Sequence, residues 1–380
     1  MIDTRVQGAV ESGFEAVRDA FAENFERHGE VGAACCVYRD GRMVVDLWGG
    51  IKQPGGTDSY DADTLQLLFS AGKGITAIVA HMLAQEGRLD FDAPVVRYWP
   101  EFGAAGKENI PVRWLFSHKA GLPVLERPIV LDDIVRWTPA VDALAAEKPV
   151  WDPGSAHGYH TYTYGWLAGE VIGRVIGGSV GRFVAERIAG PLAADFWMGL
   201  PESEMRRLAP VVPGSPPAPG SELDPLTKRL LDRESITFRS FAQLAPADFN
   251  GRPLLSSEQP ALGIGTARGL ARIYAACIGE VDGVRLIDAD TLAGATATQA
   301  HGDDLILLYE THYGTGFQLP FPFRPMAGEG SFGHYGSGGS VGFANPRLGI
   351  AFGYAMNRLG PVWGADPRSK SLVDALLACL

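Results

Sequence analysis

Ser70 and Lys73 form the only Ser-x-x-Lys pair of the chain, and their side chains can act as nucleophile and base. A strand-like run at 65–69 precedes Ser70, and apolar residues at helical spacing follow it as far as Gly87. The Ser70 hydroxyl and backbone N–H then lie at the positive end of a helix, with Lys73 one turn further on the same face. A lysine takes the proton of a serine only where its surroundings lower its pKa, and the apolar neighbours favour such burial. The competing interpretation is a helix cap followed by a surface lysine.

A second run of chemically active side chains lies at 157–170, between an Asp-Pro-Gly turn and an expected helix. A tyrosine beside Ser70 and Lys73 could carry the proton from the nucleophile to the leaving group, because a nearby cation lowers the pKa of a phenol. A histidine could serve as the base instead. The residue types alone leave the choice open among three tyrosines and two histidines: Tyr159, Tyr162, Tyr164, His157 and His160.

The glycine-rich run 333–343 is typical of a strand whose backbone approaches a ligand closely. One of its backbone N–H groups could join that of Ser70 in an oxyanion hole, whereas the alternative is an edge strand or bulge without such a role. The run also contains Gly-Gly-Ser-Val-Gly around Ser340, which formally matches the nucleophile motif of α/β-hydrolases. In that fold the catalytic acid and histidine follow the serine, but the last histidine here, His334, precedes Ser340. We therefore interpret the match as misleading.

The elements around these motifs are helix and strands at both ends of the chain, with mainly helices between. Proline crowding at 209–222 predicts a surface excursion within the helical part. The expected elements are a helix at 10–27, a β-hairpin at 32–48 turning at Asp40-Gly41, helices at 164–176 and 267–278, strands at 340–344 and 349–357, and a closing helix at 366–380. Thr266 and Asp366 are the expected caps of the last two helices.

This order predicts an α+β fold in which an antiparallel sheet, flanked by the N- and C-terminal helices, receives an inserted, mainly helical domain. The predicted sheet domain comprises residues 1–72 plus 290–380, and the helical domain comprises residues 73–289. Ser70 then lies at the junction of the two.

The composition excludes several classes of protein. The chain has 380 residues, 46% of them apolar, and its 44 acidic against 33 basic side chains include no basic block, so nucleic acid is not an expected partner. No apolar run approaches the roughly 20 residues of a membrane-spanning helix, and no secretory signal is visible, so we expect a cytoplasmic protein. Its four cysteines show neither a disulfide framework nor metal spacing, and we expect small core residues, no metal and no cofactor: Cys35, Cys36, Cys277 and Cys379.

Taken in order, the three motifs resemble those of the serine β-lactamase and penicillin-binding-protein superfamily, and more closely the class C β-lactamase-like esterases called family VIII carboxylesterases. The resemblance covers nearly the whole chain, including matches at 86–95, 112–123, 265–268 and 352–357. It implies a β-lactamase-like fold, with Ser70 as the nucleophile, Lys73 as its partner and Tyr159 as the tyrosine of the proton relay. His334, Tyr335 and Gly336 match the family's Lys-Thr-Gly or His-Thr-Gly strand, and Ser337 would supply the second oxyanion N–H.

Two departures from the β-lactamase pattern bear on the substrate. Thr161 stands where β-lactamases and peptidases carry an amide-recognising Asn, and His334 stands where they carry a carboxylate-attracting Lys. No Glu-x-x-Leu-Asn motif is present either, so the resemblance implies that Lys73 and Tyr159 serve both half-reactions. We expect a hydrolase of small carboxylic esters, most simply short acyl esters. The alternatives are a β-lactamase or D-amino-acid peptidase, an acyltransferase, and a catalytically silent binding module on the same scaffold.

Overall fold

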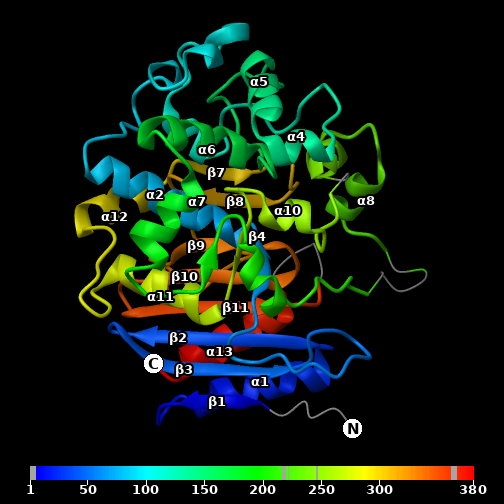
Figure 1. Cartoon of the computed structure of the whole chain (residues 1–380), viewed down its shortest axis with the longest axis vertical. Coiled ribbons are helices and arrows are strands. Elements are labelled where there is room, and N and C mark those ends of the chain that lie inside the picture. Colours follow the sequence, from blue (N-terminus) through cyan, green and yellow to red (C-terminus); the bar gives the residue numbers. More distant parts are fainter. Residues whose placement is uncertain (1–5, 216–219, 221, 245–246, 361–365) are drawn as a thin grey trace.

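Six antiparallel strands form the main sheet, in the order β1-β3-β2-β11-β10-β9 (Figure 1). The computed structural model describes residues 6–380 except 216–219, 221, 245–246 and 361–365. The two ends of the chain meet in this sheet, because β2 pairs with β11. The strands are β1 (Gln7–Val10), β2 (Gly32–Arg39), β3 (Arg42–Gly50), β9 (Phe332–Tyr335), β10 (Val341–Asn345) and β11 (Ile350–Met356).

Helices cover both faces of the main sheet. On one face α1 (Glu15–Arg27) and α13 (Pro367–Ala378) pack together and against the sheet, and α11 (Ala267–Ile278) covers the other face (Figure 1). Cys35 belongs to the cluster under α1 and α13, whereas Cys36 belongs to the cluster under α11. The central strands are therefore buried on both faces, which is why they are apolar throughout rather than alternating.

The helical half of the molecule is built around α2 (Ala71–Gln85), whose residues from Ala71 to Leu83 are all buried. Two small sheets support it: β4 (Gln66–Phe69) pairs with β6 (Gly263–Gly265), which pairs with β5 (Phe196–Trp197), and β7 (Ala300–Asp303) pairs with β8 (Glu310–Tyr313). The other helices are α3 (Val112–Phe116), α4 (Leu131–Arg136), α5 (Thr138–Ala146), α6 (Thr163–Ile176), α7 (Val180–Val184), α8 (Pro225–Leu231), α9 (Ile236–Phe241), α10 (Arg252–Ser256) and α12 (Ala289–Thr296).

The expected local signals are confirmed. Asp40 and Gly41 both have positive φ, +48° and +78°, as the tight turn between β2 and β3 requires. The side chain of Thr266 accepts a hydrogen bond from the N–H of Gly269 at the start of α11, and that of Asp366 accepts one from Arg368 at the start of α13. These caps use backbone N–H groups that the helices leave unpaired, so a sequence can specify them locally.

The boundary between the two predicted domains stays a prediction, but the packing bears on it. α11 comes from the stretch assigned to the helical domain and packs against β2, β10 and β11. One cluster of buried side chains runs from the α11 face of the sheet through α2 and into α6. The two parts of the chain therefore share a core.

The proline-rich segment 209–222 lies partly outside the described residues. In its described part, Val212 donates its N–H to the carbonyl of Asn357 and accepts a hydrogen bond from Leu359. Prolines prevent a helix here, but Val212 has a backbone N–H and can still pair with the residues that follow β11. This part of the segment is thus bonded to the end of the sheet as well as to the helical half.

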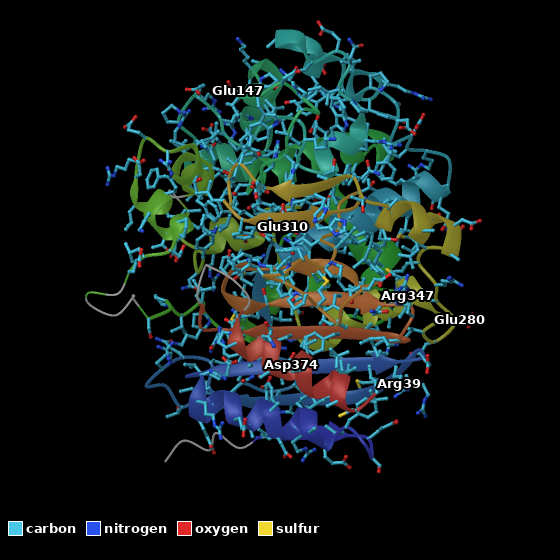
Figure 2. All side chains as sticks on the ribbon, turned by 180° about the vertical axis from the view of Figure 1, so that it is seen from behind. Arg39, Glu147, Glu280, Glu310, Arg347 and Asp374 are labelled. Carbon is cyan, nitrogen blue, oxygen red and sulfur yellow. The ribbon has the colours of Figure 1, made fainter. Side chains whose placement is uncertain are left out.

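No helix in the described part of the chain is both long and apolar enough to cross a membrane. Charged side chains of both signs are distributed over the surface, as the exposed residues Glu280, Glu310, Arg347 and Asp374 illustrate (Figure 2).

Candidate active site

Ser70 is positioned by the sharp transition from β4 to α2. The residue before it, Phe69, has φ +49°, a left-handed conformation that is uncommon for a bulky side chain and typical of a constrained site. Ser70 occupies the cap position of α2, yet its side chain makes no capping hydrogen bond. The residue is only 7% exposed and lines a cavity that Tyr159 and Ser337 also line. The Ser70 side chain therefore does not cap the helix, which contradicts the simple-cap interpretation.

Lys73 lies one turn further along α2, fully buried beneath Ser70. Its Nζ donates hydrogen bonds to Ser70 Oγ at 2.9 Å and to the backbone carbonyl of Thr161 at 2.7 Å. Within the described residues no carboxylate forms an ion pair with it, and burial lowers the pKa of Lys73 well below its ordinary value. The arrangement favours a neutral amine, which can accept a proton from the serine.

Of the three competing tyrosines, the structure brings Tyr159 to the Ser70–Lys73 pair. Lys73 Nζ lies 4.8 Å from the centre of the Tyr159 ring. Burial raises the pKa of Tyr159, while a hydrogen bond with the Ser70 hydroxyl and the charge of Arg324 partly lower it, so the phenol keeps its proton at neutral pH. Tyr164 instead donates its hydroxyl to the backbone carbonyl of Lys73, and Tyr162 lines the cavity at its wall.

The two histidines of the same run are occupied elsewhere. His157 pairs through Nε2 with the Thr311 hydroxyl, and His160 accepts the N–H of Leu122 on Nε2. Burial lowers the pKa of both imidazoles to about 4. The structure therefore leaves neither of them as the base for Ser70.

The glycine-rich run forms the opposite wall of the cavity. Gly336 and Ser337, at the end of β9, both line it. A Cβ on Gly336 would lie 2.1 Å from the carbonyl oxygen of Leu68, so only glycine lets this strand approach the Ser70 segment so closely. Within the described part of the chain, neither the N–H of Ser70 nor that of Ser337 donates a hydrogen bond. Two free N–H groups flanking a hydroxyl can stabilise an oxyanion.

Two residues singled out in this run lie away from the cavity. His334 is 1% exposed, does not line the cavity, and bonds through Nδ1 with the carbonyl of Tyr335, so the geometry gives no support to a direct contact with substrate. Ser340 is completely buried and donates its hydroxyl to the Leu68 carbonyl at 2.8 Å, as expected for a structural serine.

Asp304, between β7 and β8, is a site residue that sequence reasoning missed. Its Oδ1 accepts the backbone N–H of Tyr159 at 3.0 Å and those of Ile306 and Leu307 at 2.9 Å. Burial raises the pKa of this carboxyl to about 6 although all three hydrogen bonds lower it. Asp304 thus ties the Tyr159 backbone to the small sheet, and no motif links two residues so distant in sequence.

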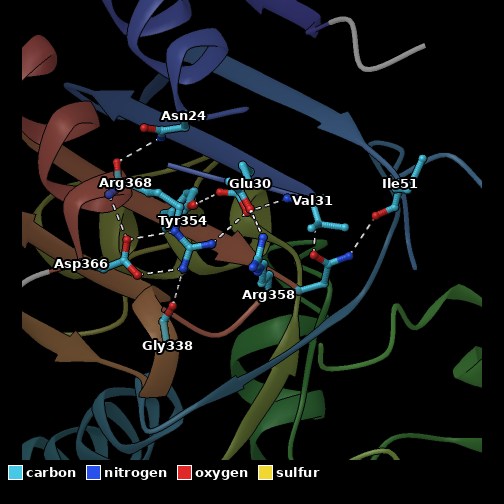
Figure 3. A network of polar contacts seen from close by, with 12 residues as sticks. Asn24, Glu30, Val31, Ile51, Gly338, Tyr354, Arg358, Asp366 and Arg368 are labelled. Atoms are coloured by element: carbon cyan, nitrogen blue, oxygen red, sulfur yellow. Dashed lines mark hydrogen bonds and ion pairs between the residues drawn. The ribbon is translucent and has the colours of Figure 1, made fainter. Parts of the chain in front are cut away.

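A buried ion network lies behind the Ser337 loop and was also missed (Figure 3). Arg368 forms ion pairs with Glu30 at 3.0 Å and with Asp366 at 2.7 Å, and all three side chains are at most 3% exposed. The same guanidinium donates to the carbonyl of Gly338 at 2.7 Å, one residue beyond Ser337. Only the cap Asp366 was visible in the sequence, because Glu30 lies 338 residues from Arg368 and Gly338 lies 30 residues from it.

No group of histidine, cysteine or acidic side chains in the described chain could hold a metal ion. Cys35, Cys36 and Cys277 are buried free thiols, in agreement with the expected role as core residues, whereas Cys379 is only half-buried.

Comparison with known proteins gives consistent matches over nearly the whole chain. The family model described as Beta-lactamase matches residues 17–377. A protein of Mycobacterium tuberculosis named esterase/beta-lactamase LipL is 37% identical over 363 residues, which cover 93% of this chain and 83% of that protein. The fold is similar to a family VIII carboxylesterase (TM-score 0.88) and to a penicillin-binding protein homologue from Caulobacter crescentus (TM-score 0.90), each 36% identical and covering 99% of this chain and 100% of the other.

Proposed function

Because the chain belongs to the beta-lactamase family and is a serine hydrolase of the esterase and β-lactamase type, we propose that it hydrolyses carboxylic esters through an acyl-enzyme on Ser70. The observation that carries this proposal is the buried amine of Lys73, which lies 2.9 Å from Ser70 Oγ without a carboxylate partner in the described chain. A lysine in this state can act as a base near neutral pH.

In the proposed acylation step, Lys73 takes the proton of Ser70 as Oγ attacks the ester carbonyl. The backbone N–H groups of Ser70 and Ser337 hold the resulting oxyanion. When the tetrahedral intermediate collapses, the bond to the alcohol oxygen breaks and the Tyr159 phenol supplies the proton that this oxygen needs. Lys73 then returns its proton to Tyr159, which leaves both groups as they began.

Deacylation uses the same relay, with water as the nucleophile and the Ser70 oxygen as the leaving group. Water gives its proton to Lys73 as it attacks the acyl carbon, the oxyanion forms at the same two N–H groups, and the ester bond to Ser70 breaks. The Ser70 oxygen regains a proton through Tyr159 and Lys73, and the carboxylic acid leaves. The raised pKa of Tyr159 supports its role as a proton donor rather than as a standing phenolate.

The surroundings of Thr161 support esters over amides as substrates. Its backbone carbonyl accepts the Lys73 hydrogen bond, and its hydroxyl pairs with Ser240 Oγ at 2.9 Å. No side-chain amide is offered at this position to recognise an amide group of a substrate. β-Lactam hydrolysis is the second candidate function, because the named relative combines both activities in its name.

Hydrolysis of para-nitrophenyl acetate by two serine variants tests the proposal. Ser70→Ala should lose roughly 10⁴-fold or more of kcat, because it removes the nucleophile. Ser340→Ala is the matched control, since it changes the serine of the misleading motif, and it should retain most of the activity. Labelling by a fluorophosphonate should disappear only in Ser70→Ala. If Ser340→Ala abolished turnover and labelling while Ser70→Ala kept them, the proposed function would be wrong.

Turnover of a chromogenic cephalosporin, a D-Ala-D-Ala peptide and a short acyl ester by the unchanged protein separates the candidate substrates. We expect the ester to have the highest kcat/KM. A higher kcat/KM for the cephalosporin would make β-lactam hydrolysis the principal activity.

A further inference from the structure

Tyr159 lies in a loop that no helix or strand holds in place. Residues 157–162 adopt neither structure, yet the proposed relay needs the Tyr159 hydroxyl at a fixed place beside Ser70. A misplacement of about 1 Å can slow an enzymatic step by roughly 10²-fold. The contacts that hold this loop therefore matter for the reaction, even where they lie outside the cavity.

His118, two residues beyond the end of α3, binds the backbone on both sides of Tyr159. The N–H of Gly158 donates to the backbone carbonyl of His118, and the N–H of His160 donates to its ring atom Nδ1, each at 3.1 Å. Between these two, the N–H of Tyr159 donates to Asp304. Three successive N–H groups of the loop are thus held from outside it, two of them by one histidine.

The imidazole of His118 also packs against the phenol ring itself. The side chain is 1% exposed, and its ring centre lies 4.9 Å from that of Tyr159 and 4.7 Å from that of Tyr313 in β8. A ring packed between such neighbours has little freedom to turn. Because His118 does not line the cavity, it can affect the reaction only through the residues that it holds.

The backbone conformation and the charge state of His118 suit this role. Its φ is +61°, a left-handed conformation that few side chains adopt and that the surrounding structure must impose. In this conformation one residue offers both its carbonyl oxygen and its ring nitrogen to the same loop. Burial lowers the pKa of the imidazole well below its ordinary value, so the ring stays neutral and its Nδ1 can accept the N–H of His160.

We propose that His118 is a positioning residue, which holds the Tyr159 phenol where it can protonate the leaving alcohol. The inference rests on the proposed esterase function and adds to it a residue that does not meet the substrate. It predicts a defect that depends on the alcohol. A weakly acidic alcohol needs a proton before its bond to the acyl group breaks, whereas para-nitrophenolate is stable enough to leave without one.

Ethyl acetate and para-nitrophenyl acetate share their acyl part and provide the test. His118→Ala keeps the backbone carbonyl but removes the ring with its Nδ1. We expect this variant to lower kcat/KM, which reports acylation, by roughly 10- to 100-fold for ethyl acetate and by less than about 3-fold for para-nitrophenyl acetate. Because both esters are measured on one preparation, a loss of folded protein lowers both values equally.

His118→Asn should restore part of the activity toward ethyl acetate. Its Oδ1 can accept the N–H of His160, and asparagine tolerates a left-handed backbone. The matched control is His81→Ala, which removes another buried imidazole, bonded through Nε2 to the carbonyl of Thr315. This control should change the two kcat/KM values by the same factor.

The double variant with Tyr159→Phe tests whether His118 acts through the phenol. Tyr159→Phe alone removes the proton donor and should impair ethyl acetate far more than para-nitrophenyl acetate. Added to Tyr159→Phe, the change His118→Ala should no longer alter the ratio of the two kcat/KM values, because no phenol is left to be positioned.

Equal losses for the two esters in His118→Ala would overturn the inference, since they would show a general structural role. An undiminished kcat/KM for ethyl acetate would overturn it as well. If His118→Asn were as impaired as His118→Ala, the Nδ1 acceptor would not be what holds the phenol. Failure of the proposed function looks different: the unchanged protein would leave ethyl acetate intact, or Tyr159→Phe would lose equal activity toward both esters.

Discussion

At the scale of single residues, burial decides the chemistry of the site. Lys73 and Tyr159 have ordinary side chains, but their surroundings shift both pKa values, that of Lys73 downward and that of Tyr159 upward. In the mechanism we propose, these shifts favour a deprotonated base and a protonated acid within the same pH range. They are the physical reason why we propose activation of a serine that has no histidine partner.

The pH dependence of kcat/KM should report the neutral form of Lys73. Since only the unprotonated amine accepts the Ser70 proton, kcat/KM for para-nitrophenyl acetate should rise with pH through a pKa well below 10.5, the model value for lysine. Lys73→Arg, which stays protonated, should lose roughly 10³-fold or more of the rate at every pH measured. Lys119→Arg, a control outside the cavity lining, should keep the profile, and an unchanged rising limb in Lys73→Arg would contradict the assignment.

Asp304 should make the folded protein bind a proton between pH 3.8 and about 6, because burial raises its pKa from the first of these values to the second. Its contribution to the free energy of unfolding is present below pH 3.8 and is lost as the pH rises through 6. Asp304→Asn keeps an oxygen for the three N–H donors without the charge. Its stability relative to the unchanged protein should therefore improve by up to about 3 kcal/mol between pH 4 and pH 7.

Urea unfolding at several pH values measures this difference. Asp304→Ala is the companion variant: it leaves three N–H groups without their acceptor and should lower the free energy of unfolding by about 2 to 4 kcal/mol at pH 4, a deficit that shrinks toward pH 7 because alanine does not titrate. The opposite result would contradict this prediction. If the stability of Asp304→Asn fell relative to the unchanged protein as the pH rose, the fold would be stabilising the carboxylate.

At the scale of elements, α13 supports the loop that carries Ser337. The Arg368 side chain, on α13, donates a hydrogen bond to the carbonyl of Gly338 and forms ion pairs with Glu30 and Asp366 (Figure 3). Each partner is buried, so the guanidinium cannot be removed without leaving two carboxylates uncompensated. The C-terminal helix therefore both covers the sheet and holds the backbone of the loop that carries Ser337.

Arg368→Lys should lower kcat for para-nitrophenyl acetate by roughly 10- to 100-fold with little change in KM, because the oxyanion N–H is needed most in the transition state. It should also lower stability, since one ammonium cannot satisfy all the partners of the guanidinium. Arg358→Lys is the control, because among the described residues the Arg358 side chain bonds only to Gly29 and Ser215, near the same network. Equal effects on kcat in both variants would indicate a general structural loss rather than an effect on the loop.

At the scale of the whole molecule, the sheet and the helical half share one buried cluster through α11. Leu270 of α11 is fully buried and packs over Gly342 of β10, where a Cβ would come within 2.5 Å of it. A core that both halves complete favours their unfolding together, even in a chain of this length.

Urea unfolding followed by tryptophan fluorescence and by far-ultraviolet circular dichroism should therefore give a single coincident transition. Leu270→Ala should shift both curves together, by about 2 to 5 kcal/mol. Leu377→Ala, a change at an exposed position of α13, should shift neither by much. Separate transitions in the two signals would show that the halves unfold independently.

The sequence by itself determined the features that depend on neighbouring residues. The Asp40-Gly41 turn, the caps Thr266 and Asp366, and the placement of Ser70 and Lys73 on successive turns follow from local backbone chemistry. The residue types left open which tyrosine meets Ser70, although the resemblance pointed to Tyr159. Only the tertiary structure brought Arg324 to the cavity and bonded Asp304 and Arg368 to the backbone of Tyr159 and Gly338 in its wall. The reason is physical: hydrogen bonds and ion pairs between elements depend on distances that the fold sets, and a motif records spacing along the chain but not proximity across it.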